Sequence, residues 1–253
     1  MSAGVRLDRL LVDRGLAPSR ERAQRLIMAG DVLVDERPVS KPGAVVPGAA
    51  VLRLRTAPSP WASRGGEKLA GALDALEVDP GGRVCLDVGA SSGGFTDVLL
   101  SRGARRVIAL DVGYGQLAWA LRQDPRVMVL ERVNARVLEP AMLPEAPALA
   151  TVDVSFISLA LVLPAVVRVL APGGEVLALV KPQFEAGRGE VGKGGVVRDP
   201  AVRAACVARV RAAAAALGLV AAGEAASVLP GPKGNVETFL RLVSAPAAGG
   251  SGG

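Results

Sequence analysis

The 253-residue sequence contains no histidine. Without an imidazole it can form neither a Ser-His-Asp triad, nor a Cys-His pair, nor a metal site with histidine ligands. Any catalysis must therefore rely on lysine, carboxylates, hydroxyls, a metal ion with oxygen ligands, or a bound cofactor.

Cysteines and aromatic residues are also scarce. Cys85 and Cys206 are the two cysteines and lie far apart in the sequence, which excludes a zinc ribbon and a disulfide framework. Aromatic side chains make up only 3% of the residues, whereas 50% of the residues are hydrophobic. The chain can therefore bury a sizeable core, which must consist mainly of Ala, Val and Leu.

The sequence lacks a long hydrophobic run. The most apolar stretch, Ala212–Gly223, spans 12 residues, whereas a membrane-spanning helix needs about 20. The N-terminus also lacks the uninterrupted apolar region of a signal peptide, because Asp8 and Asp13 fall within it. These absences predict a soluble, cytoplasmic protein with no membrane partner.

Positive charge is concentrated near the N-terminus. Residues 1–60 contain 10 Lys and Arg against 6 Asp and Glu, and the whole chain has a net charge of +6. A local basic excess favours a polyanionic partner such as a nucleic acid, since cationic side chains release the counterions of phosphates. A solvated basic face without a partner is the alternative explanation.

The first 56 residues predict a small α+β domain of a kind that recurs in RNA-binding proteins. Residues 5–30 have the apolar spacing of two short helices, and Ser19 is a suitable N-cap for the second. Short strands are expected at Val32–Val34 and Val51–Leu54, with a turn at Asp35-Glu36. A Pro-rich linker at 57–63 follows, and the Ala, Gly and Ser tail at 245–253 is expected to be disordered.

Residues 64–244 predict a second, larger domain in which strands and helices alternate. This alternation favours a doubly wound, mainly parallel sheet of seven strands. The last two strands have no clear helix between them and could pair antiparallel. The expected strands are Arg83–Val88, Val107–Val112, Val127–Leu130, Ala148–Val154, Glu175–Val180, Val220–Val228 and Val236–Val243. The expected helices are Phe95–Arg102, Gln116–Arg122, Leu159–Leu170 and Pro200–Leu217.

The first strand of the larger domain runs into a glycine-rich turn at 87–95. Ligands of open α/β sheets bind at the carboxyl ends of the strands, and glycines allow the backbone to approach them closely. The turn is not G-x-G-x-x-G, which disfavours a dinucleotide. Asp111 ends the second strand, where a carboxylate can accept hydrogen bonds from a ribose diol, and Asn134 follows the third, where it could meet an adenine edge. The combination resembles the class I Rossmann-like S-adenosylmethionine methyltransferase fold.

This interpretation defines a candidate site for S-adenosylmethionine. The residues expected to hold that cofactor are Asp87, Gly89, Ala90, Ser91, Gly93, Gly94, Phe95, Asp111 and Asn134.

Four charged residues lie in unusual settings around this candidate site. Lys68 precedes the first strand, Asp153 ends the fourth, Lys181 ends the fifth, and Glu237 begins the last. Each alone could be an ordinary surface charge. The ends of strands meet at one edge of such a sheet, so four charged groups there are better explained as one constellation.

In this order, Lys68, Asp153, Lys181 and Glu237 resemble the catalytic tetrad of FtsJ-like ribose 2′-O-methyltransferases. More closely, the chain resembles the TlyA family of rRNA (cytidine-2′-O)-methyltransferases, many of which are labelled haemolysins. That family joins an N-terminal ribosomal-protein-type RNA-binding domain to an FtsJ-like domain. The resemblance covers residues 5 to 243, with no tetrad position replaced. It is carried by 64–69, 87–95, 111–119, 153–159, 181–185, 192–199 and 231–239.

The resemblance implies methyl transfer from S-adenosylmethionine to a cytidine 2′-hydroxyl in 16S or 23S rRNA, or in both. Lys181 is expected nearest the reacting oxygen, either as a base or as a cation that stabilises the developing alkoxide. Asp153 would orient Lys181, and Lys68 with Glu237 would complete the network. No metal is required, because the positive sulfur already activates the leaving group.

The N-terminal domain is expected to supply affinity for rRNA in ribosomal subunits. Sparse aromatics argue against extended base-stacking platforms and favour recognition of a folded RNA surface. The candidate phosphate contacts are Arg6, Arg20, Arg22 and Lys41, with Arg14 and Arg25 as further candidates.

Three alternative functions compete with this one. A non-enzymatic RNA-binding or ribosome-assembly factor conflicts with the complete tetrad and glycine turn. A pore-forming haemolysin conflicts with the absence of a signal peptide and of spanning segments. A small-molecule methyltransferase leaves the basic N-terminal domain unexplained.

Overall fold

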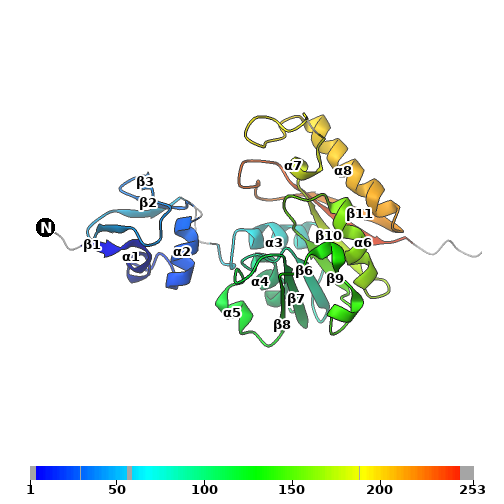
Figure 1. Cartoon of the computed structure of the whole chain (residues 1–253), viewed down its shortest axis with the longest axis horizontal. Coiled ribbons are helices and arrows are strands. Elements are labelled where there is room, and N and C mark those ends of the chain that lie inside the picture. The colour runs from blue at the N-terminus through cyan, green and yellow to red at the C-terminus, as the bar shows by residue number, and fades with distance from the viewer. Residues whose placement is uncertain (1–3, 29, 56–58, 188, 246–253) are drawn as a thin grey trace, which may run out of the picture. The chain divides into compact units, whose positions relative to one another are not determined.

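The computed structural model describes residues 4–28, 30–55, 59–187 and 189–245 (Figure 1). The chain divides into two compact units, residues 1–60 and 61–253, each with its own hydrophobic core. Residues 57–58 of the predicted linker and 246–253 of the predicted tail lie outside the described residues.

The first unit combines two helices with small antiparallel sheets. The leucines that predict the first helix, Leu7, Leu10 and Leu11, are all buried in the core of this unit. Ser19 caps the second helix as expected, since its Oγ accepts a hydrogen bond from the backbone of Arg22. The elements are β1 (Gly4–Arg6), α1 (Leu7–Asp13), α2 (Arg20–Met28), β2 (Val32–Val34), β3 (Arg37–Pro38), β4 (Val45–Pro47) and β5 (Leu52–Leu54).

Strand pairing in the first unit follows from its turns. Asp35 and Glu36 both have positive φ, 48° and 63°, which is the backbone of a tight hairpin between β2 and β3. β5 pairs with the other side of β2, and β1 pairs with β4 in a separate ladder. The sequence predicts the turn and the two strands β2 and β5. It does not predict the two-residue β3 or the pairing of β1 with β4.

The second unit contains the seven-stranded sheet that the sequence predicts. The strand order is β11-β12-β10-β9-β6-β7-β8, with neighbours parallel from β10 to β8 and with β12 antiparallel to both β10 and β11. The strands are β6 (Val84–Val88), β7 (Arg106–Asp111), β8 (Val127–Glu131), β9 (Leu149–Val152), β10 (Glu175–Val180), β11 (Leu219–Ala226) and β12 (Thr238–Ser244). The antiparallel pairing of the last two strands is confirmed.

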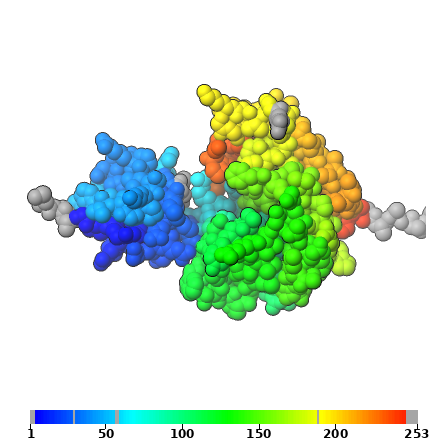
Figure 2. Space-filling view, in the orientation of Figure 1, coloured from blue at the N-terminus to red at the C-terminus, as the bar shows by residue number. Residues whose placement is uncertain are grey.

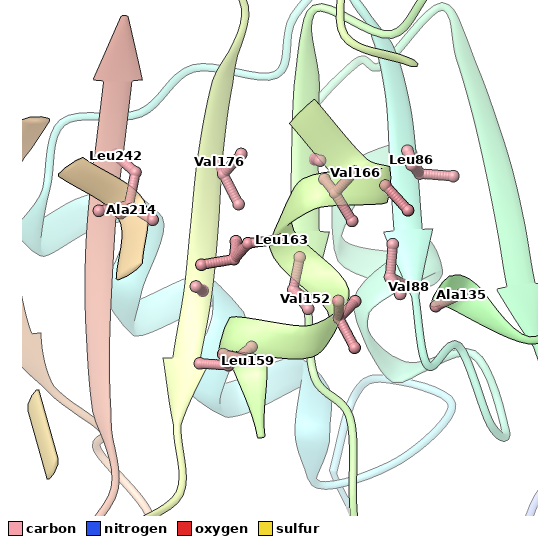
Figure 3. Close-up of a cluster of buried hydrophobic side chains, with 14 of the residues drawn as sticks. Leu86, Val88, Ala135, Val152, Leu159, Leu163, Val166, Val176, Ala214 and Leu242 are labelled. Atoms are coloured by element: carbon pink, nitrogen blue, oxygen red, sulfur yellow. The ribbon is translucent and has the colours of Figure 1, made fainter. Parts of the chain in front are cut away.

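Helices cover both faces of this sheet, and the alternation of side chains along each strand determines which core each residue joins. In β6, Leu86 and Val88 point into the core beneath α6 (Leu159–Val169) and α8 (Pro200–Ala215), as Figure 3 shows for α6. Cys85 of the same strand joins the opposite core with α3 (Gly65–Ala75) and α4 (Gly94–Ser101). The long apolar strands follow from this burial on both faces.

Two helices differ from the expectation. The predicted helix Gln116–Arg122 is reduced to α5 (Trp119–Arg122), because Ala118 is extended and its N–H donates to Ser92 rather than to a helical turn. α3 was not expected, since Gly65 and Gly66 at its start are poor helix formers. Residues after Gly66 carry its apolar stripe.

Short helices complete the second unit. They are η1 (Ala135–Val137), η2 (Pro140–Met142) and α7 (Pro182–Glu185). The segment between α7 and α8, yellow in Figure 2, lies on the surface of this unit.

A buried ion-pair network closes the end of the sheet at which β10 begins. The carboxylate of Glu175 is 8% exposed and accepts hydrogen bonds from Arg83 at 2.5 Å and from Arg241 at 2.7 Å. Arg83 precedes β6 and Arg241 lies in β12, so the carboxylate joins β10 to its neighbour β12 and, across β9, to β6.

We expect Glu175→Ala to lower the free energy of unfolding by about 2 kcal/mol, because it leaves two partly buried cations without their anion. Glu224→Ala is the matched control, since its 43% exposed carboxylate pairs with Arg211 on the surface and contributes about 0–1 kcal/mol. Urea unfolding of both variants measures the difference. Equal losses would contradict a stabilising role for the buried network.

Candidate active site

The glycine-rich turn after β6 is shaped by close packing within the protein. A Cβ at Gly89, where φ is 87°, would lie 2.3 Å from the carbonyl oxygen of Asp153. A Cβ at Gly94 would lie 2.2 Å from Ser63 Oγ and 2.9 Å from the backbone nitrogen of Gly66. The immediate neighbours of these glycines in the structure are the loop after β9 and the start of α3, and close approach by a ligand stays a prediction.

Asp111 at the end of β7 holds this turn in place. One carboxylate oxygen accepts a hydrogen bond from Ser91 N at 2.8 Å, and the other accepts one from Gly113 N at 2.7 Å. Ser91 has a φ of 49°, a conformation that needs support from its surroundings. The Asp111 carboxylate therefore connects the end of β7 to the turn after β6. It is partly exposed and retains lone pairs that can accept hydrogen bonds from a ligand.

Asp87 does not lie where a ligand can reach it. Its side chain is fully buried, and its carboxylate accepts hydrogen bonds from Thr96 at 2.7 Å and from Thr151 at 3.3 Å. Burial, together with the nearby charge of Asp153, raises the pKa of Asp87 to about 7 against the lowering effect of these hydrogen bonds. Asp87 thus fixes α4 and β9 against β6, rather than offering a free carboxylate.

The other predicted cofactor residues divide between core and surface. Phe95 is buried at 4% exposure and packs against Phe239 with ring centroids 6.0 Å apart, so its side chain belongs to the core. Ala90, Gly93 and Gly94 are buried, whereas Ser91 is exposed and Gly89 is partly exposed. Asn134 is exposed and caps η1 through a hydrogen bond from Arg136 N to its Oδ1.

The four charged residues of the expected constellation form two ion pairs. Lys181 Nζ lies 2.5 Å from Asp153 Oδ1, and the two side chains are 12% and 21% exposed. Lys68 Nζ lies 2.6 Å from Glu237 Oε2, and these side chains are 11% and 1% exposed. Each lysine is thus neutralised by its own carboxylate at a largely buried position.

Strand register brings both pairs to one edge of the sheet. Val180 of β10 lies opposite Thr238 of β12, so the preceding Glu237 and the following Lys181 continue the same two strands past the sheet. Val152 of β9 pairs with β6 and β10, which places the next residue, Asp153, between the glycine-rich turn and Lys181. The antiparallel β12 is what allows the beginning of a strand to share this edge.

The loop from Asp153 to Ser158 contains polar and aromatic residues that are not among the predicted site residues. Ser155 Oγ accepts a hydrogen bond from Lys181 Nζ at 3.0 Å. Phe156 is 91% exposed with a φ of 64°, and its ring lies 5.1 Å from that of Phe184 in α7. The sequence does hold one indication of these residues. Aromatic side chains are scarce, yet two of the four phenylalanines follow Asp153 and Lys181 by three residues each.

An open cavity of about 660 Å³ adjoins this loop. Its walls include the rings of Phe156 and Phe184, the side chain of Leu161, and the polar residues Asn134 and Arg136. A flat, partly polar group therefore has room beside Phe156 and Phe184, on the loop that follows Asp153.

Asp8 organises the predicted RNA-binding residues of the first unit. This fully buried carboxylate accepts hydrogen bonds from Arg6 at 2.9 and 3.1 Å, from Arg20 at 3.1 Å and from Gln24 at 2.9 Å. The hydrogen bond from Arg6 is the largest of the effects that hold the pKa of Asp8 well below its usual range. Arg6 and Arg20 remain 51% and 58% exposed, so one buried anion holds two exposed cations together.

The remaining basic candidates have different surroundings. Lys41 is exposed and lies two residues before Gly43, which the Arg6 guanidinium approaches. Arg22 donates to the carbonyl of Ser59 at 3.2 Å. The further candidates Arg14 and Arg25 are bound within the unit: Arg14 donates to the carbonyls of residues 48 and 50, and Arg25 pairs with residue 21.

Comparison with known families matches both units. Residues 61–243 match the FtsJ-like methyltransferase family, and residues 5–52 match the S4 domain.

Individual relatives match along most of the chain. The 16S/23S rRNA (cytidine-2′-O)-methyltransferase TlyA of Mycobacterium tuberculosis is 53% identical over 96% of this chain and 91% of its own length. The 23S rRNA (cytidine-2′-O)-methyltransferase TlyA of Campylobacter jejuni is 34% identical over 72% of this chain and 71% of its own. A solved structure from Streptococcus thermophilus with a hemolysin designation has a TM-score of 0.76 at 41% identity, covering 97% of this chain and 90% of that one.

The raised pKa of Asp87 makes a prediction about stability and pH. An unfolded Asp releases its proton near pH 4, whereas the folded Asp87 retains it up to about pH 7. Between these values the folded state binds more protons, so this residue lowers stability as pH rises and has no further effect above about pH 7. Asp87→Asn removes the titration while keeping groups that can bond to Thr96 and Thr151.

We therefore expect the stability of Asp87→Asn relative to the wild-type protein to increase from pH 4 to pH 7 and then to stay constant. Chemical denaturation at a series of pH values measures this difference directly. Parallel stability curves across the range would show that Asp87 ionises normally in the folded protein.

Proposed function

Because the chain belongs to the TlyA family of FtsJ-like methyltransferases, we propose that it transfers a methyl group from S-adenosylmethionine to the 2′-hydroxyl of a cytidine in 16S or 23S rRNA, or in both. The Lys181–Asp153 pair beside the glycine-rich turn is the observation that carries this proposal. It offers a cation and a carboxylate at the edge of the sheet where a cofactor and a substrate hydroxyl would meet.

The residues around the turn fit S-adenosylmethionine chemically. Asp111 retains carboxylate lone pairs that can accept hydrogen bonds from a ribose diol. Asn134 uses its Oδ1 within η1, so its Nδ2 is the group available to donate to an adenine nitrogen. Asp87 and Phe95 act from the interior by holding the turn. When bound, the cofactor supplies a methyl group on a positively charged sulfur.

Methyl transfer requires a ribose oxygen held in line at near-attack distance, and that oxygen must lose its proton. Lys181 is our candidate for the nearest side chain, and Asp153 and Ser155 fix its Nζ from two sides. Lys181 either accepts the proton from the 2′-hydroxyl or stays charged and stabilises the developing alkoxide. If Lys181 stays charged, the proton of the hydroxyl leaves to water, and in both cases the bound cofactor would supply the methyl group that the oxygen gains.

The second ion pair acts through position rather than by contact. Glu237 is 1% exposed and lies beneath Gly231, whose hypothetical Cβ would be 2.5 Å from Glu237 Oε1. Lys68 is also buried and occupies the α3 side of the pair. We therefore assign Lys68 and Glu237 to the electrostatic framework around Lys181, with Asp153 as its direct partner.

Phe156 supports a nucleotide substrate. Its ring is 91% exposed and lies 5.1 Å from the ring of Phe184, so it is accessible to a binding partner. Nucleobases stack on aromatic rings, and a cavity with polar walls adjoins this one. We assign Phe156 to contact with a base near the methylated ribose.

The first unit supports an RNA substrate as large as a ribosomal subunit. Its exposed Arg6 and Arg20 are both bonded to the buried Asp8, Lys41 is exposed as well, and cations held in fixed positions suit a folded phosphate backbone. Among the residues the structure describes, none of the helices is long and apolar enough to cross a bilayer.

Lys181→Ala tests the catalytic proposal. We expect methyl transfer to purified ribosomal subunits to fall by about 10³-fold, because the variant loses its proton acceptor or alkoxide partner. Binding of S-adenosylmethionine, measured by calorimetry, should persist, since the cofactor residues lie on other strands. Transfer of radiolabelled methyl groups at the wild-type rate would refute the assignment, and a wild-type protein that methylates neither subunit would refute the function itself.

Lys181→Arg separates the two possible roles. Arginine keeps the positive charge but does not act as a base. Substantial activity would identify Lys181 as a charge stabiliser, whereas loss equal to that of the Ala variant, with the fold intact, would favour proton transfer.

Arg20→Ala tests the RNA-binding surface. We expect weaker binding to rRNA and a decrease of about one in the slope of log affinity against log salt, because one phosphate contact is lost. Arg53→Ala is the matched control, since Arg53 is 56% exposed in the same unit and pairs with Glu36. Filter binding at several salt concentrations distinguishes them. Equal effects of the two substitutions on rRNA affinity would indicate that Arg20 contributes only through the overall charge of the unit.

A further inference from the structure

The loop that carries Asp153 has to be held by contacts outside itself. It joins β9 to α6 and contains Phe156, a bulky residue with φ of 64°. L-residues rarely adopt this backbone conformation, and it persists only where the surrounding structure enforces it. The restraints on this loop therefore bear directly on where Asp153 lies.

Three contacts connect this loop to the segment that begins with Lys181. At one end, Lys181 bonds to Asp153 and Ser155. In the middle, the rings of Phe156 and Phe184 lie 5.1 Å apart at 49°. At the other end, Glu185 receives hydrogen bonds from the last loop residue and the first residue of α6.

The Glu185 contact uses both oxygens of one carboxylate. Oε2 accepts from Ser158 Oγ at 2.7 Å, and Oε1 accepts from Leu159 N at 2.7 Å. Both donors belong to the N-terminal end of α6, where free backbone N–H groups favour an acceptor. Burial raises the pKa of Glu185, although these two hydrogen bonds and the charge of Arg209 lower it. Burying a carboxylate costs free energy, and here the hydrogen bonds from Ser158 and Leu159 offset that cost.

We propose that Glu185 is a positioning residue for methyl transfer. It fastens the far end of the Asp153–Ser158 loop to α7, four residues after Lys181, and thereby fixes the distance between Lys181 and Asp153 and the direction of Phe156. Glu185 does not touch the reacting atoms. The inference rests on the proposed function, because it assigns Lys181 and Asp153 to the reaction.

The test compares single-turnover methyl transfer at saturating S-adenosylmethionine and ribosomal subunits. Glu185→Ala is expected to slow the transfer step by on the order of 10²-fold, because a displaced reacting group is far less effective. Glu185→Gln is expected to stay within about fivefold of wild type, since its amide can accept from Leu159 N and donate to Ser158 Oγ. Both variants should bind S-adenosylmethionine with wild-type affinity, as β6 and β7 are unaffected.

Two further variants keep the test decisive. Ser158→Ala removes the hydrogen bond to Glu185 Oε2 together with the N-cap bond from Ala160 N, and should slow transfer several-fold even if Glu185→Ala does not fold. Glu224→Ala removes a surface carboxylate and should leave the rate unchanged.

Rescue by Gln together with a loss confined to the transfer step supports the positioning role. Wild-type rates in Glu185→Ala or in Ser158→Ala overturn it, as does an equal loss of cofactor binding, which would indicate general unfolding. Because the wild-type protein must methylate rRNA in the same assay, failure of the proposed function is seen separately.

Discussion

Charged groups at a desolvated sheet edge must be neutralised by close partners, and this requirement organises the second unit. Lys181 and Lys68 are each largely buried, and each lies against its own carboxylate. An isolated charge at either position would be strongly unfavourable. The partners come from different elements, so the pairs can form only when the ends of β9 and β10 meet the start of β12 and α3 packs beside them. The proposed catalytic geometry and the sheet topology therefore depend on each other.

The same principle shapes the first unit with the signs reversed. There a buried anion, Asp8, gathers exposed cations, whereas in the second unit two mostly buried cations face carboxylates. The difference matches the two tasks. A phosphate-binding surface needs its positive charge exposed and fixed, whereas a group that handles a proton during methyl transfer needs a dry environment.

The sequence predicts the sheet well because its strands are buried on both faces and appear as continuous apolar runs. It predicts the four charged positions because three of them directly follow or precede such runs. It does not predict α3, whose start at Gly65-Gly66 has low helix propensity, although a Cβ at Gly66 would lie only 2.4 Å from the side chain of Trp61. It does not predict that Asp87 is fully buried and bonded to Thr151, because Thr151 comes from an element remote in the sequence. Glu185 was missed for the same reason.

The absence of histidine has a structural consequence beyond the exclusion of familiar triads. An imidazole titrates near neutral pH without special surroundings, whereas lysine and carboxylates need burial and partners to act there. In the proposed methyl transfer the positive sulfur already activates the leaving group. The rate therefore depends less on a strong acid or base and more on the alignment of the ribose oxygen with the methyl group. We therefore expect this site to depend mainly on the precise placement of its side chains. Polar restraints concentrate on Lys181 and on the loop after β9, and even the glycines of the turn serve to bring that loop closer.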